Sequence, residues 1–155
     1  MRMAEPPTPI PPVAFWLGTG GLIPFVVLTG GLYAAGEGVG TMLLFWLTAY
    51  GAVILSFVGA LHWGIALVHP AMNANDRALF MAWSVVPALA AWAAMLMRPG
   101  TGVLLMAATY IVHYLADQQL AQRFTLPGWY VKLRGGLTAV VVVCLVLVYP
   151  WLAHH

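Results

Sequence analysis

The stretch TMLLFWLTAYGAVILSFVGALHWGIALV (residues 41–68) contains no aspartate, glutamate, lysine or arginine. A bilayer core about 30 Å thick is crossed by a helix of roughly 20 apolar residues, so this stretch is long enough to span a membrane. A strand is excluded because the apolar run is too long and does not alternate with polar residues. The stretch therefore predicts a membrane-spanning helix.

Apolar stretches of similar length recur along the chain, separated by short segments rich in glycine, proline and charged residues. We expect membrane-spanning helices at about 13–34, 41–68, 78–97, 101–122 and 134–152. Only 6% of the residues are charged and 63% are hydrophobic, whereas soluble domains carry about 25% charged residues. The sequence therefore predicts an all-α integral membrane bundle of five transmembrane helices.

The chain divides into a proline-rich lead, one membrane domain and a short tail. We place these at 1–12, 13–152 and 153–155. The lead does not combine an apolar core with a small-residue cleavage site as a secretory signal does, so we expect the first apolar segment to be retained. Cys144 is the sole cysteine and is expected to be a small buried apolar residue. No basic cluster suggests a nucleic-acid partner.

The basic residues lie unevenly on the two sides of a five-span chain. The N-terminal side carries Arg2, Arg77, Arg123, Lys132 and Arg134. The opposite side carries Arg98. Because lysine and arginine are enriched in cytoplasmic loops, we expect the N-terminus in the cytoplasm and the C-terminus outside, in the periplasm.

Segment 41–68 has one side of small residues and one side of large ones. Small residues recur at every fourth position, at Ala52, Ser56, Ala60 and Gly64, and Gly59 lies on the same side. Small residues at this spacing let helix backbones approach closely within a bilayer. We therefore expect this side to pack inside the bundle and to carry His62 with it.

Segment 101–122 contains a polar stripe, since Tyr110, His113, Tyr114 and Asp117 share one helical face. Arg134 lies at the same predicted depth, at the start of the last segment. We expect one polar pocket between the second and fourth segments that opens toward the cytoplasm. Its predicted lining is Ser56, His62, Tyr110, His113, Tyr114, Asp117 and Arg134. The last segment is nearly featureless after Thr138, which suggests an outer, lipid-exposed position.

The two histidines allow two interpretations. His62 and His113 lie at similar depths on inward faces, so they can ligate a b-type haem from both sides, with Arg134 or Arg123 facing the propionates. The alternative is hydrogen bonding between helices. No dedicated metal site is expected beyond this haem alternative.

Asp117 and Arg134 also allow two interpretations. Ionisable groups within a membrane are candidates for a substrate or proton site, but these two can equally form a structural ion pair near the membrane interface. The tyrosines and His113 can hold a quinone or another flat amphipathic ligand, and ordinary helix packing is the alternative.

Three phrases resemble one known family. FWLGTGGLIPF (15–25), YGAVILSFVGALHWG (50–64) and LPGWYVKLRGGLT (126–138) are similar to an uncharacterised multi-pass membrane family of proteobacteria and mitochondria that includes transmembrane protein 69. The resemblance implies a protein of the bacterial inner membrane, and mitochondrial relatives fit a partner among respiratory membrane proteins. It assigns no role to the matching residues, which are Ser56, Gly59, His62, Trp63, Gly64, Trp129, Tyr130, Arg134 and Thr138.

The sequence contains no nucleophile elbow, no zinc-protease helix, no phosphate loop and no paired carboxylates. We therefore expect a protein that is not an enzyme and that binds a small amphipathic ligand or a partner membrane protein through the polar pocket. A haem- or quinone-binding redox protein is one alternative. A dimeric channel or carrier is another. Transporters are commonly built from internal repeats, and five unequal helices show none, so transport would need two copies of the chain.

Overall fold

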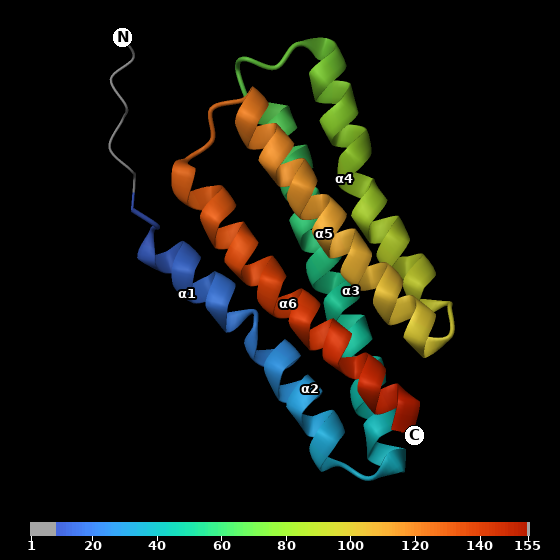
Figure 1. Ribbon diagram of the computed structural model, residues 1–155. Coiled ribbons are helices and arrows are strands. Elements are labelled where there is room, and N and C mark those ends of the chain that lie inside the picture. The colour runs from blue at the N-terminus through green and yellow to red at the C-terminus, as the bar shows by residue number, and fades with distance from the viewer. Residues whose placement is uncertain (1–8, 155) are drawn as a thin grey trace.

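A computed structural model describes residues 9–154 of the chain, and within that range it contains six helices and no strand (Figure 1). The helices are α1 (Pro12–Gly20), α2 (Ile23–Ala34), α3 (Glu37–Val68), α4 (Ala74–Met95), α5 (Pro99–Arg123) and α6 (Gly128–His154). They make five segments long and apolar enough to cross a membrane, with α1 and α2 forming the first together. The predicted five-span helical bundle is confirmed. Residues 1–8, with Arg2, and residue 155 lie outside the described range.

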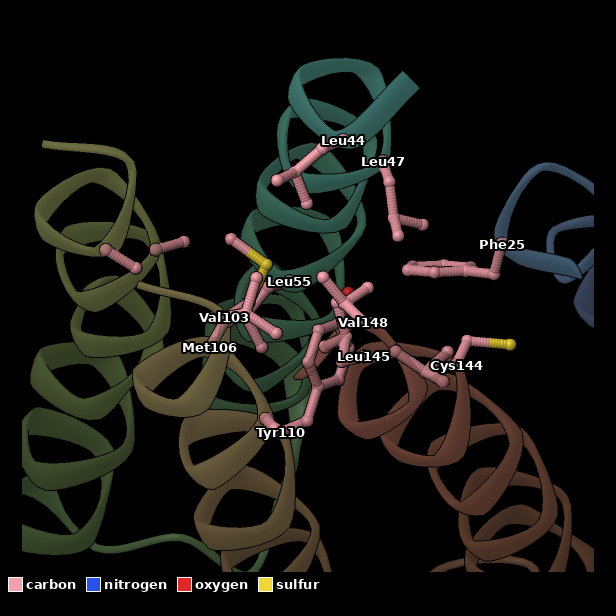
Figure 2. Close-up of a cluster of buried hydrophobic side chains, with 14 of the residues drawn as sticks. Phe25, Leu44, Leu47, Leu55, Val103, Met106, Tyr110, Cys144, Leu145 and Val148 are labelled. Carbon is pink, nitrogen blue, oxygen red and sulfur yellow. The ribbon is translucent and has the colours of Figure 1, made fainter. Parts of the chain in front are cut away.

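Helix α3 is central to the bundle and packs against α2, α4 and α5 (Figure 1). Helix α6 packs against α5, α2 and α1. Figure 2 shows side chains of α3, α5 and α6 directed into one shared space, among them Leu55, Val103, Met106 and Leu145. This apolar cluster fills the half of the bundle that lies away from the polar residues described below.

The position predicted for the last helix was wrong. One stripe of α6 is buried, at Val141, Cys144, Leu145 and Val148. An almost uniformly apolar helix has no polar face to mark its outer side, so its sequence does not show which stripe packs. The helix also begins at Gly128 rather than near residue 134, because the turn after Pro127 is already helical. This earlier start brings Tyr130 onto the same helix as Arg134.

The first span is broken rather than merely kinked. Helix α1 ends at Gly20 and α2 begins at Ile23, with Pro24 in its first turn. Proline lacks the N–H that would continue the hydrogen-bond ladder, and it is tolerated best in a first turn. The chain therefore forms two shorter helices within the single span predicted at about 13–34.

The small residues of α3 pack only in part as predicted. Gly59 is buried against α4, where a Cβ on this residue would lie 2.7 Å from the Ser84 carbonyl oxygen. Ala60 and Gly64 are exposed, and a Cβ at Gly64 would meet nothing within 4 Å. A repeat of four residues drifts around a helix of 3.6 residues per turn. The series that begins at Ala52 therefore rotates out of the interface before it reaches Gly64.

These two glycines provide a matched test of the α3–α4 contact. We expect Gly59→Ala to destabilise the protein by about 1–3 kcal/mol, because overpacking against a backbone oxygen forces the helices apart. Gly64→Ala should leave stability unchanged or raise it by up to about 1 kcal/mol, since alanine favours helix and the site is open. Unfolding of both variants in mixed micelles measures the difference. Equal stability of the two variants would contradict the close packing.

Candidate functional site

Four of the predicted polar residues, His62, His113, Asp117 and Arg134, gather in one part of the bundle. It lies toward the end at which α3 and α5 end and α6 begins (Figure 1). Helix α3 ends at Val68, just before His69 and Pro70, because a residue that precedes proline disfavours helical backbone. Helix α4 then starts at an Asn73 cap that accepts a hydrogen bond from the Asp76 N–H. Side chains from the last turns of α3 and the first turns of α6 meet at α5, where His62 and Arg134 both contact Asp117.

Asp117 of α5 is the centre of a buried hydrogen-bond network, with its side chain 0% exposed. Its Oδ1 accepts from His62 Nε2 at 2.9 Å and from the Tyr130 hydroxyl at 3.1 Å. Its Oδ2 accepts from Arg134 Nε at 2.8 Å. Three donors from α3 and α6 therefore hold one carboxylate, and the predicted Asp117–Arg134 ion pair is present.

His113 is held from two sides. Trp83 of α4 donates from Nε1 to His113 Nδ1 at 3.2 Å. The opposite nitrogen, Nε2, lies 3.1 Å from the Val58 carbonyl oxygen. A nitrogen that accepts from an indole carries no proton, so Nε2 carries the proton and donates it to Val58, and the ring is neutral. His113 thereby links α5 to both α3 and α4.

The two imidazoles lie against each other, with ring centroids 4.7 Å apart and an angle of 43° between the planes. Phe80 of α4 packs edge-on against the His62 ring. His62 Nδ1 is buried and has no hydrogen-bond partner among residues 9–154. We assign the proton to Nε2 and a lone pair to Nδ1, because burying an N–H donor without a partner costs more free energy than burying an unused acceptor. The contact between the His62 and His113 rings shows that α3 and α5 turn their polar sides toward each other, as expected.

Three of the predicted pocket residues lie outside this network. The Tyr110 hydroxyl donates to the Gly51 carbonyl oxygen at 2.7 Å and its ring belongs to the apolar cluster. Tyr114 is half-buried over Gly135 of α6. Ser56 donates to the Ala52 carbonyl oxygen within its own helix and lies on the α4 side of α3. Ser56 is thus misplaced in our prediction, since its helical position carries it toward α4.

The network is also sealed rather than open. His62, His113 and Asp117 are each 0% exposed, and the Arg134 side chain is only 8% exposed. The predicted open pocket between α3 and α5 is therefore a packed cluster. Most of its polar atoms pair with one another, which is how buried polar groups are tolerated, and His62 Nδ1 and Arg134 Nη2 are the exceptions among the described residues.

A metal or haem would have to displace existing bonds in this cluster. His62, His113 and Asp117 each offer one possible metal-ligand atom, and these three atoms all lie within 4.8 Å of one another. Both nitrogens of His113 and both oxygens of Asp117 are already engaged, as is His62 Nε2. A bis-histidine haem needs the iron between the two imidazoles, and the rings are in direct contact. The haem alternative remains a prediction that requires both rings to move.

A cavity of about 110 Å³ adjoins the network on the other side of Arg134. Its wall comes from α1, α2, α3, α5 and α6 and is mostly apolar, with Leu22, Ile54 and Leu137 among the lining residues. Arg134 and Thr138 are the lining residues from the start of α6 that have polar side chains. Arg134 Nη2 and Thr138 Oγ1 are buried and have no hydrogen-bond partner in the described part of the chain.

Sequence reasoning assigned no partner role to Trp83, Tyr130 or Thr138. Tyr130 and Thr138 were marked only through the family resemblance. The spacing of Tyr130, Arg134 and Thr138 by four residues puts them on one helical face, but this signal needed a helix that begins at Gly128. Nothing in the sequence alone pairs the Trp83 indole with His113.

The phrases that carried the resemblance lie in this part of the molecule, and a comparison with protein families agrees with them. The family model described as "Protein of unknown function (DUF3429)" matches residues 10–150. The chain belongs to this family. The family description names no activity, so membership identifies relatives and assigns no chemistry to the network.

One relative in this family is transmembrane protein 69 of Xenopus tropicalis, which is 36% identical to the chain over 146 residues. The match covers 88% of this chain and 53% of that protein, so the chain spans about half the length of the curated relative. The comparison with solved structures found no match. The family resemblance inferred from the sequence is confirmed.

Proposed function

We propose that this protein is a non-enzymatic membrane protein that binds a small amphipathic molecule in the cavity beside Arg134. The observation that carries the proposal is a mostly apolar cavity lined in part by Arg134 and Thr138, two residues that each have a buried polar atom without a hydrogen-bond partner among the described residues. Ligand sites in proteins are mostly apolar concavities with a few polar groups that fix orientation. A buried polar group without a partner is unfavourable, and a bound ligand would supply one.

The network gives Arg134 a fixed orientation for this role. Asp117 accepts a hydrogen bond from Arg134 Nε, and this contact fixes the plane of the rigid guanidinium beside the cavity. Leu17 and Phe57 line the same cavity and are 74% and 63% exposed. These exposed apolar residues face the bilayer in a membrane bundle, so the ligand would enter sideways from the lipid.

We further place the protein in the bacterial inner membrane with the network near the cytoplasmic side. Support comes from the excess of arginine and lysine at that end. Arg77 donates to carbonyl oxygens of the last turn of α3, and Arg123 lies 3.9 Å from Asp76. The exposed apolar surface contacts lipid, and a second copy or a respiratory membrane protein are the partners that we propose for it.

Photolabelling in liposomes tests the proposed site. The probe is a long-chain alcohol that carries a diazirine, and the labelled residues are mapped by mass spectrometry. We expect saturable labelling at the cavity wall around Leu22, Ile54 and Leu137. Leu22→Trp should reduce that labelling about tenfold or more, because the larger ring fills the cavity and removes the bound state.

The matched control is Leu104→Trp, a change at an exposed position of α5 outside the cavity. It should leave labelling at the cavity wall unchanged. Labelling that never saturates, or that responds equally to both changes, would mean that the probe reports only lipid contact and that the cavity is not a binding site.

A further inference from the structure

We infer that the cavity takes a neutral molecule with a carbonyl oxygen on an apolar body, such as a quinone or an ester lipid, and discriminates against anionic amphiphiles. The inference rests on the proposed function and names the chemical class of its ligand. It depends on the charges already present around the cavity and on the unpartnered polar atoms of Arg134 and Thr138, two of its lining residues.

The charge of Arg134 is already compensated inside the protein. Asp117 lies 2.8 Å from Arg134 Nε, and the two side chains are 0% and 8% exposed. The carboxylate and the guanidinium therefore form a buried pair of zero net charge. An anionic headgroup against Nη2 would add a second negative charge without a second cation, and a buried charge without a counter-charge is strongly unfavourable.

The neighbouring titratable groups do not change this balance. His113 is neutral, because its Nδ1 accepts from Trp83 and its Nε2 donates to Val58. Tyr130 donates its hydroxyl proton to Asp117, and Tyr110 donates to the Gly51 carbonyl oxygen. His62 donates to Asp117 from Nε2 and has no partner at Nδ1 among the described residues. None of these groups offers a free positive charge to an anion.

The two unpartnered atoms suit an acceptor. Arg134 Nη2 can only donate, and the Thr138 hydroxyl can donate as well. The residues are four apart on α6, so they occupy one face of the helix one turn from each other. A carbonyl oxygen has two lone pairs and can accept from both groups.

The size of the cavity sets a limit on the bound part. An engineered cavity of about 150 Å³ in another protein binds benzene, so a cavity of about 110 Å³ accommodates a group near the size of one ring or an ester. The remainder of the molecule would leave between Leu17 and Phe57 toward the lipid. This geometry fits an apolar tail that stays in the bilayer.

Competition against the diazirine alcohol tests the inference. The competitors are methyl hexadecanoate and hexadecanoate, compared under alkaline conditions in which the acid is ionised. They share one chain and differ in the charge of the head. We expect the ester to displace the probe at a concentration at least about tenfold lower than the acid. Decylubiquinone and monoolein as further competitors distinguish a quinone from an ester lipid as the better ligand.

Thr138→Val tests the polar contact with little change of volume. It should weaken binding of the ester about two- to tenfold, because one neutral hydrogen bond is lost. Thr109→Val is the matched control, since the Thr109 hydroxyl donates to the Leu105 carbonyl oxygen outside the cavity. Thermal unfolding of both variants checks that each is folded.

The outcomes separate the two proposals. Displacement by the acid at the same concentration as the ester, or a lower one, overturns the inference of a neutral ligand and leaves the binding site intact. An unchanged ester affinity in Thr138→Val also overturns it. Failure of every competitor to compete, together with unsaturable labelling, removes the binding site itself.

Discussion

Asp117→Asn is expected to destabilise the protein by about 3–5 kcal/mol, because it leaves the buried Arg134 guanidinium without its counter-charge. The parent contact joins Arg134 Nε to Asp117 Oδ2 at 2.8 Å with the carboxylate fully buried. The asparagine oxygen can still accept from His62 and Tyr130, but its amide nitrogen then faces Arg134 Nε, so the change removes both the charge and the hydrogen bond to Arg134. Reversible unfolding in mixed micelles measures the loss.

The companion changes make this expectation specific to the pair. Arg134→Gln should cost a similar amount, since it leaves the Asp117 carboxylate unpaired. The double variant should be less destabilised than the sum of the two, with a coupling of about 1–3 kcal/mol. Asp76→Asn is the control, because the Asp76 side chain is 28% exposed and its contact with Arg123 is 3.9 Å long. If the double variant loses as much unfolding free energy as the two single variants together, the two residues are not coupled.

Gly102→Ala is expected to be the second large effect, at about 3 kcal/mol or more. Gly102 lies in the first turns of α5, directly against the last turn of α4. A Cβ at this position would lie 2.2 Å from the Ala94 carbonyl oxygen and 3.2 Å from its carbonyl carbon. Backbone atoms cannot rotate aside as a side chain can, so the two helices must separate at their hairpin. The melting temperature in detergent reports the change.

Gly100→Ala provides the control in the same turn. Its added Cβ would meet Tyr149 and Leu152 at 3.7 and 3.8 Å, which is ordinary contact. We expect Gly100→Ala to change stability by less than about 1 kcal/mol, with a gain from the better helix propensity of alanine. A Gly102→Ala variant as stable as Gly100→Ala would show that the α4–α5 hairpin is looser than described.

The architecture and the inward polar stripe could be predicted because both leave periodic signals. Long uncharged segments predicted the spans. The shared face of His113 and Asp117 predicted burial of both, and the structure places them in one network with His62 and Arg134. The exposed position of Gly64 was missed because a four-residue repeat was treated as if it followed the helical turn.

The remaining features depend on distances between helices that no single segment encodes. The cavity beside Arg134 is formed by residues of five helices, so no segment shows it alone. Trp83 reaches His113 from a separate helix, across a sequence separation of 30 residues. Tyr130 was outside the predicted span because its start was placed six residues too late (134 against 128). Each of these features could be found only from the packed arrangement of the helices together with the sequence pattern.

The Asp117–Arg134 contact also has a consequence for biosynthesis. The two residues are 17 positions apart, so the acid is made before its base. At about 5–20 residues per second, the ribosome adds Arg134 roughly one to three seconds later. Until the final span enters the bilayer, the Asp117 carboxylate of the nascent chain has no guanidinium beside it. Integration of that span therefore supplies the counter-charge of a carboxylate that is already committed to the membrane.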